Sequence, residues 1–164
     1  MSKLADALAA CARSQQPTPA TAASPLRLQC TLAPPAPPGE IERAWPERPL
    51  PADIVEAWSI CRQARLFEDA DYGQWGLHLL TPDASAKRTE HELAQRPNDY
   101  NSDDIVIAEF LGDQDLLVFD HDGSVLVALP LDPRNDWFRP TPSLGDFLER
   151  YVSSTGAKYW EPRA

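Results

Sequence analysis

Three short apolar runs between residues 104 and 131 constrain the fold of this chain more than any other stretch. They cover residues 105–111, 116–119 and 125–129 and are rich in β-branched and aromatic side chains, which pack well on a pleated surface. Turn-forming residues separate the runs, and the second separator contains Asp122 and Gly123, a pair that tolerates the positive φ angles of a tight hairpin. This pattern predicts a three-stranded antiparallel meander with at least part of both faces covered.

A helix is expected after the meander. Ser143 is its candidate N-cap, Asp146 has capping-box spacing, and an amphipathic face is formed by Leu144, Phe147, Leu148, Tyr151 and Val152. An aromatic tail at residues 158–161 is expected to fold back after it.

An earlier helix is expected to begin at Pro51 and Asp53 and to end at Leu66 and Phe67. Its apolar stripe would consist of Ile54, Trp58, Cys61 and Arg65. An acidic loop at 68–73, a strand at 75–80 and a polar surface helix at 83–96 would follow, with irregular chain at 132–142. The predicted fold class is α+β, a single antiparallel β-sheet with a central meander, flanked by N- and C-terminal helices.

The first 38 residues differ in composition from the rest of the chain. Seven prolines lie between Gln15 and Gly39, which disfavours both helix and central strand. A short helix from Ser2 to Arg13 and one edge strand around Leu28 are compatible with the pattern. We therefore expect an Ala/Pro-rich, largely flexible leader at residues 1–38 and a globular domain at residues 39–164.

The formal net charge of −10 is unevenly distributed. The first 38 residues hold three basic side chains and one acidic, a charge of +2, so the remainder carries −12. A body this acidic repels nucleic acid and anionic lipid and attracts basic partners. The expected partner is a protein with a basic surface, and neither nucleic acid nor membrane. The alternative is that the acidity only keeps the protein soluble.

Three cysteines without paired spacing indicate free thiols in a reducing cytoplasm. No apolar run approaches the roughly 20 residues that span a bilayer, and Asp6 and Arg13 interrupt the N-terminal Ala/Leu stretch, which is therefore a poor secretion signal. We expect a cytoplasmic protein.

Signals for catalysis are weak. The three histidines, His78, His91 and His121, are scattered, and hairpin chemistry already explains the acids beside His121. Phosphate-binding, dinucleotide-binding and nucleophile-elbow motifs are absent from the sequence. We expect a protein that is not an enzyme and has no catalytic residue, no metal and no cofactor.

Several segments resemble the SUKH superfamily: LPADIVEAW at 50–58, GLHLL at 76–80, the runs at 105–129 and SLGDFL at 143–148. The resemblance covers residues 40–161 in the family's order, with departures at 63–65, where the family has Asn-Gly, and in the Pro-rich leader. It implies a SUKH-like fold without a shared catalytic site. Bacterial members are thought to be immunity proteins that bind and block a nuclease or deaminase toxin, and eukaryotic relatives act as adaptors.

Acidity and resemblance together predict a binding surface of acidic loops with aromatic anchors. The candidate acids are Glu68, Asp69 and Asp71 in one loop, Asp99, Asp103 and Asp104 in a second, and Asp113 and Asp115 in a hairpin turn. The candidate anchors are Tyr72, Trp75 and Tyr100. For each acid, a solvated surface charge is the competing interpretation. The competing function is an intracellular adaptor or regulatory subunit with no toxin partner, which uses the prolines at 34–38 as a docking peptide.

Overall fold

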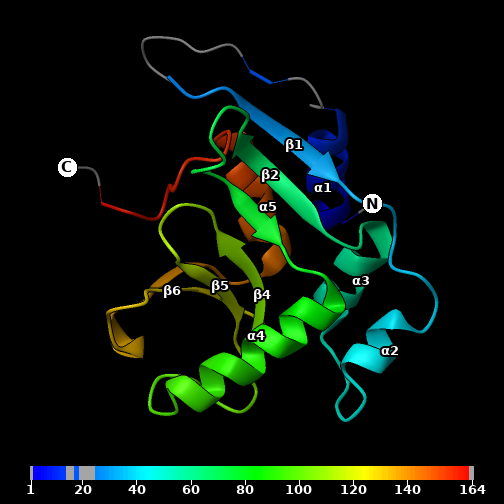
Figure 1. Cartoon of the computed structure of the whole chain (residues 1–164), viewed down its shortest axis with the longest axis vertical. Coiled ribbons are helices and arrows are strands. Elements are labelled where there is room, and N and C mark those ends of the chain that lie inside the picture. The colour runs from blue at the N-terminus through cyan, green and yellow to red at the C-terminus, as the bar shows by residue number, and fades with distance from the viewer. Residues whose placement is uncertain (1, 14–16, 19–24, 163–164) are drawn as a thin grey trace.

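One seven-stranded antiparallel sheet organises the computed structural model, which describes residues 2–13, 17–18 and 25–162 (Figure 1). The strands are β1 (Leu28–Leu32), β2 (Ala64–Asp69), β3 (Leu77–Leu79), β4 (Ile105–Phe110), β5 (Leu116–Phe119), β6 (Val125–Ala128) and β7 (Phe138–Thr141). Every strand pairs with its neighbour in sequence. The predicted meander is therefore confirmed as β4-β5-β6, the middle of a longer one.

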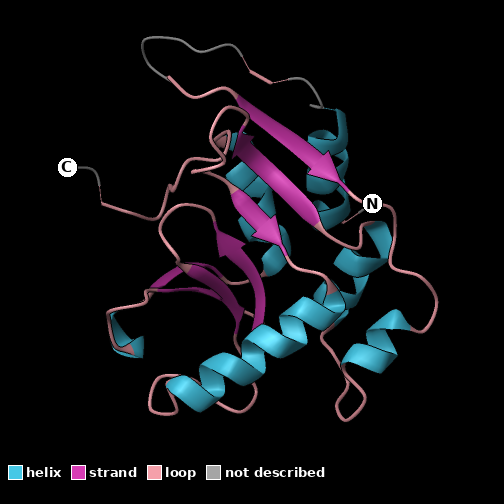
Figure 2. Ribbon diagram, viewed as in Figure 1, coloured by secondary structure: helices cyan, strands magenta, loops and turns pink. Residues whose placement is uncertain are grey.

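Helices cover both faces of the sheet, which confirms the α+β class. Within the described residues they are α1 (Lys3–Arg13), α2 (Glu40–Ala44), α3 (Ala52–Ile60), α4 (Pro82–Gln95), the 3-10 helix η1 (Arg134–Asp136) and α5 (Leu144–Ser153). Helices α1, α3 and α5 pack together on one face, and α4 crosses the other face over β4 (Figure 2).

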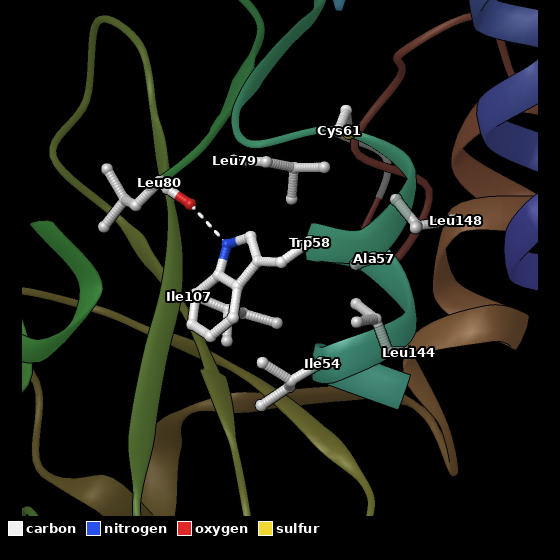
Figure 3. A pocket seen from close by; sticks show the side chains of 9 residues that line it. All are labelled: Ile54, Ala57, Trp58, Cys61, Leu79, Leu80, Ile107, Leu144 and Leu148. Carbon is white, nitrogen blue, oxygen red and sulfur yellow. Dashed lines mark hydrogen bonds between the residues drawn. The ribbon is translucent and has the colours of Figure 1, made fainter. Parts of the chain in front are cut away.

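The larger core lies between the sheet and α1, α3 and α5. Trp58 of α3 lies within it, and its indole Nε1–H donates to the carbonyl oxygen of Leu80 at 2.9 Å (Figure 3). Ile54 of α3 and Leu144 and Leu148 of α5 surround a small apolar cavity beside this ring. Because its one polar atom is paired, the indole contributes its full apolar area to the core.

The second face of the sheet has a smaller core and a polar contact with α4. Ser85 of α4 donates its hydroxyl to the carbonyl of Val106, and Thr89 accepts from the Val106 N–H at 2.9 Å. Since β3 ends at Leu79, these side chains supply the hydrogen bonds that Val106 does not obtain from that strand.

The expected domain boundary at residue 39 is wrong. Leu4 and Leu8 of α1 are buried in the larger core, where α1 packs against α5, and β1 carries the buried Leu28 and Cys30. The predicted helix and edge strand do form, but they belong to the globular body because each buries its apolar side chains there. The expected N-cap of α1 is confirmed, since the Ser2 hydroxyl accepts from the N–H of Ala5 at 3.0 Å.

The helix expected up to residue 65 ends at Ile60, and Ala64–Asp69 is the strand β2. Cys61 is already extended, with φ −147° and ψ 136°. Ala64 and Leu66 are buried while Arg65 between them is exposed, which is the two-residue period of a strand. The four-residue spacing from Cys61 to Arg65 imitated a helical stripe.

Three further elements were not predicted: α2, η1 and β7. Strand β7 lies inside the expected irregular stretch at 132–142 and contains Pro140. A proline is tolerated there because β7 is an edge strand and needs only one row of ladder hydrogen bonds.

The C-terminal prediction is confirmed. Ser143 caps α5 by accepting from the N–H of Asp146 at 3.0 Å. The aromatic tail folds back, with Trp160 packed 5.4 Å from the ring centres of both Phe110 and Phe147. This contact joins the end of the chain to the sheet and to α5.

Candidate protein-binding surface

Three acidic segments far apart in sequence meet around one arginine. They are residues 99–104 before β4, residues 120–124 between β5 and β6, and residues 132–136 before β7, and they contain seven aspartates and one arginine, Arg134. We call these three segments the aspartate face.

Arg134 ties the segments together. Its guanidinium bonds both carboxylate oxygens of Asp104, at 2.5 and 3.1 Å, and lies 3.3 Å from the carboxylate of Asp120. It also donates to the backbone carbonyl of Asp99 at 3.0 Å. A planar guanidinium with a bidentate carboxylate partner is the most directional ion pair available to a protein, so it fixes the relative positions of the segments.

Asp104 is the most enclosed member, with 0% of its surface exposed. Besides Arg134, it accepts from the N–H of Asn101 at 2.8 Å, and Arg48 donates to its backbone carbonyl at 3.0 Å. A buried carboxylate is tolerated only with such partners, which makes Asp104 part of the scaffold rather than a contact residue.

Asp120 and His121 form a second pair on the face, in which the imidazole Nδ1 lies 2.9 Å from the carboxylate. Burial opposes the charge of Asp120, but hydrogen bonds from the side chain and backbone of His121 hold its pKa below the ordinary value. The hydrogen bond to Asp120, with weaker attraction from Asp122 and Asp103, raises the pKa of the exposed His121. Acids of two different segments, Asp103 and Asp122, therefore act on the same imidazole.

The outer aspartates of the face form no direct ion pair with a described side chain, although Asp103 and Asp122 attract the imidazole of His121. All four are exposed, and none has an ion pair within 4.0 Å among the described side chains: Asp103, Asp122, Asp132 and Asp136. The buried members therefore use the available arginines, and the exposed members keep their charge for solvent or a partner. Of the three site residues predicted in segment 99–104, Asp103 is exposed, whereas Asp99 is half-buried and Asp104 is buried.

The first predicted loop is largely part of the sheet. Glu68 and Asp69 belong to β2, where Glu68 pairs with Arg65 at 2.8 Å and Asp69 is 3% exposed. Asp71 lies in the following turn and pairs with Arg27 at 3.0 Å. Tyr72 beside it is 80% exposed, so it is the one accessible residue of this group without a charged partner of its own.

Trp75, Asp113 and Asp115 are brought together by Lys158 of the C-terminal tail. The ammonium group pairs with Asp113, lies 3.5 Å from Asp115 and sits over the rings of Trp75 and Phe110 at 5.4 and 5.2 Å. Burial raises the pKa of Asp115 to about 6. Because Trp75 also donates to the carbonyl of Gly156 at 3.1 Å, this cluster fastens the tail to the sheet.

Tyr100 is an inner residue rather than an anchor for a partner. It is 4% exposed and packs edge-on against Trp137, with ring centres 5.1 Å apart. Sequence reasoning missed Arg134, Asp122, Asp132 and Asp136. The density of aspartates in DHD at 120–122 and LDPRND at 131–136 is the available signal, but the sequence pattern assigns the first to hairpin chemistry and the second to an irregular connection.

No protein-family model matches this chain, and no curated protein matches it. Among residues 2–13, 17–18 and 25–162, no helix is long and apolar enough to cross a membrane. Within the same part of the chain, no group of three His, Cys, Asp or Glu side chains has the arrangement of a metal site.

Proposed function

We propose that this chain is a non-catalytic acidic binding protein, an immunity protein that binds and neutralises a nuclease- or deaminase-type toxin in the cytoplasm. The observation that carries the proposal is the aspartate face, in which the Arg134 network holds exposed aspartates that form no direct ion pair with any described side chain. A toxin that attacks nucleic acid needs a basic groove, and fixed carboxylates can occupy such a groove in place of phosphates. The resemblance to the SUKH superfamily supports the same conclusion.

The test uses the C-terminal domain of the large secreted protein expected to be encoded beside this chain. Expression of that domain alone should arrest bacterial growth, and expression of the domain together with this chain should restore growth. The two purified proteins should associate quickly at low salt, and raising salt should slow association more than it speeds dissociation, because exposed charges are screened over about 10 Å at 0.1 M salt. Failure to restore growth or to form a complex would contradict the proposal.

The variant Asp103→Asn/Asp122→Asn/Asp136→Asn separates this surface from general acidity. These side chains are exposed and form no ion pair within the part of the chain that the structure describes, so the variant should fold normally. It should associate about tenfold more slowly with a flatter salt dependence, since peripheral charges act mainly on the association rate. Loss of rescue through misfolding would be visible as a lowered melting temperature.

The matched control removes three negative charges elsewhere. It replaces exposed acids of α2, the following loop and α4, namely Glu42, Glu47 and Glu90, with glutamine. If this control slows association as much as the aspartate variant, the net charge of the protein explains binding and the aspartate face does not.

An adaptor without a toxin partner is the second candidate, and the proline segment at 34–38 favours it. Pro35 and Pro38 are exposed, while the N–H of Ala36 donates to the carbonyl of Trp58 at 3.0 Å. The segment is therefore presented in a fixed, extended form that suits aromatic grooves. The variant Pro35→Ala/Pro38→Ala should leave toxin rescue intact if the immunity proposal holds.

A further inference from the structure

The loop between β6 and η1 carries the most exposed large apolar side chain of the described chain. Leu131 is 95% exposed, compared with 80% for Tyr72 and 37% for Val55. The loop lies at the outer edge of the molecule, beyond the end of β6 (Figure 1). A single exposed leucine is ordinary on a protein surface, so exposure alone assigns no role to it. The loop around Leu131, however, is held in one conformation by its neighbours.

A closed turn presents Leu131 to solvent. The N–H of Asp132 donates to the carbonyl oxygen of Leu129 at 3.4 Å, which places Pro130 and Leu131 at the two central positions. Proline fixes the backbone φ angle of the first central position, and Pro133 restricts the backbone of Asp132 on the other side. The turn therefore has few backbone conformations to lose when a partner binds.

Arg96, directly after α4, fixes both ends of this turn to the body of the protein. Its guanidinium donates to the carbonyl oxygens of Leu129 at 3.0 Å and of Asp132 at 2.6 Å. The Trp137 indole N–H donates to the same Asp132 carbonyl at 3.0 Å. Arg96 is itself held by Asp99 through two nitrogens, at 3.1 and 2.9 Å, and lies over the Trp137 ring. The leucine between these two fixed carbonyls is therefore both exposed and immobilised.

An immobilised, hydrated leucine has the properties of a binding anchor. Its burial in a partner removes apolar surface from water, and little conformational entropy is lost because the turn is already ordered. Two exposed acids follow it in the sequence, Asp132 in the turn and Asp136 in η1, and neither forms an ion pair with a described side chain. Their negative charge favours basic residues around the place where the leucine inserts.

We propose that Leu131 is the apolar anchor of the aspartate face and inserts into a hydrophobic pocket that lysine or arginine residues surround on a basic protein partner. This inference rests on the proposed function, because residues 132–136 belong to the same face. It gives the face two separate tasks. The exposed aspartates accelerate the encounter with the partner, and Leu131 slows dissociation once the complex has formed.

NMR relaxation of the free full-length protein tests the fixed turn without any partner. The backbone N–H order parameters of Leu131 and Asp132 should lie near 0.85, the value of rigid backbone. Values below about 0.6 describe a flexible loop and would overturn the proposal, whatever the partner is.

The kinetic test uses Leu131→Ala and the C-terminal toxin domain described above. Because Leu131 is almost fully exposed, this variant should fold like the parent. It should associate within about twofold of the parent rate and dissociate about twentyfold faster, since the apolar burial is gained only in the complex. Leu131→Met keeps the apolar volume and should dissociate within about threefold of the parent rate.

The outcomes separate this inference from the proposed function. If the parent forms the complex and Leu131→Ala dissociates no faster, the anchor is wrong while the proposed function stands. If the parent itself neither binds the domain nor restores growth, the proposed function is wrong, and the anchor of this face is wrong with it.

Two charged variants test the basic rim of the pocket. Leu131→Glu and Leu131→Lys both lose the apolar side chain, but only the lysine repels basic residues of the partner. Leu131→Lys should therefore dissociate faster than Leu131→Glu, and the reverse order would contradict a basic rim.

The matched control is Tyr72→Ala, which removes an exposed large apolar side chain from another loop. It should leave both rate constants within about twofold of the parent values. If Tyr72→Ala speeds dissociation as much as Leu131→Ala, the loss of any exposed apolar side chain explains the effect, and Leu131 is not the anchor.

Discussion

Arg134 joins two carboxylates that the fold buries, Asp104 and Asp120. Replacing it by methionine keeps much of its volume but leaves Asp104, which is wholly enclosed, with an unpaired charge. Removing one partner of a buried ion pair costs about 3 kcal/mol or more, so Arg134→Met should lower the free energy of unfolding by that amount in urea denaturation.

The control for this prediction is Arg139→Met. Arg139 also pairs with Asp120, at 3.3 Å, but its side chain is 55% exposed. An exposed pair contributes about 0.5 kcal/mol, so this variant should be nearly as stable as the parent. Equal losses in the two variants would show that Arg134 is not the centre of the network.

Asp115 makes stability depend on pH through its raised pKa. Burial raises that pKa to about 6 from an ordinary value of 3.8, so between pH 4 and 6 the folded state binds more protons than the unfolded state. The contribution of Asp115 to stability therefore falls as pH rises through this range. Asp115→Asn lacks this pH dependence, so the stability of the variant relative to the parent should rise by on the order of 1 kcal/mol between pH 4.5 and pH 7.

Urea denaturation of both proteins at several pH values measures this difference. The comparison is made against Asp113→Asn, whose carboxylate is more exposed and shares the same Lys158. If the stability difference between Asp115→Asn and the parent is the same at pH 4.5 and at pH 7, the Asp115 carboxyl does not titrate in this window.

Among the elements, α1 is one whose helical structure could be predicted from the sequence but whose packing partner could not. The stripe of Leu4, Leu8 and Cys11 predicted the helix correctly, because the period of apolar residues is a local property. A stripe does not say what it packs against, and the partner here is α5, about 140 residues further along the chain. The leader hypothesis failed on that missing long-range information.

Leu8→Ala tests whether α1 belongs to the folded body. Leu8 is 0% exposed, and deletion of a buried leucine side chain costs about 3 kcal/mol. The matched control is Leu131→Ala, because Leu131 is 95% exposed and should be neutral. A parent-like melting temperature for Leu8→Ala would restore the original boundary at residue 39.

The aspartate face was only partly predictable for a similar reason. Asp103 and Asp104 are neighbours in sequence, yet one is exposed and the other wholly buried, because only Asp104 turns inward to Arg134 and to the N–H of Asn101. Which aspartate stays without an ion pair also depends on the position of Arg134 in the fold, and Arg134 lies 30 residues after Asp104 in the sequence. The sequence predicted an acidic surface but not its free and paired members.

At the scale of the whole molecule, the formal charge of −10 destabilises the folded state, because like charges repel one another when the chain is compact. Moderate salt screens this repulsion, whereas the buried Arg134 pairs are screened much less. The melting temperature should therefore rise by a few degrees between 10 and 300 mM sodium chloride, as measured by circular dichroism. A falling melting temperature would show that exposed ion pairs dominate the electrostatic balance.

The contact between α1 and α5 has a consequence for synthesis on the ribosome. The strands can pair in the order in which they emerge, since each one joins its predecessor. Helix α1 emerges first but meets its partner α5 last, after a delay of about 10 s at typical elongation rates. During that interval Leu4 and Leu8 lack the α5 side chains that complete their packing, and the face of the sheet that α5 covers in the folded protein remains exposed to solvent. A chain stalled just before residue 144 is therefore a substrate for chaperones, although all seven strands precede that point in the sequence.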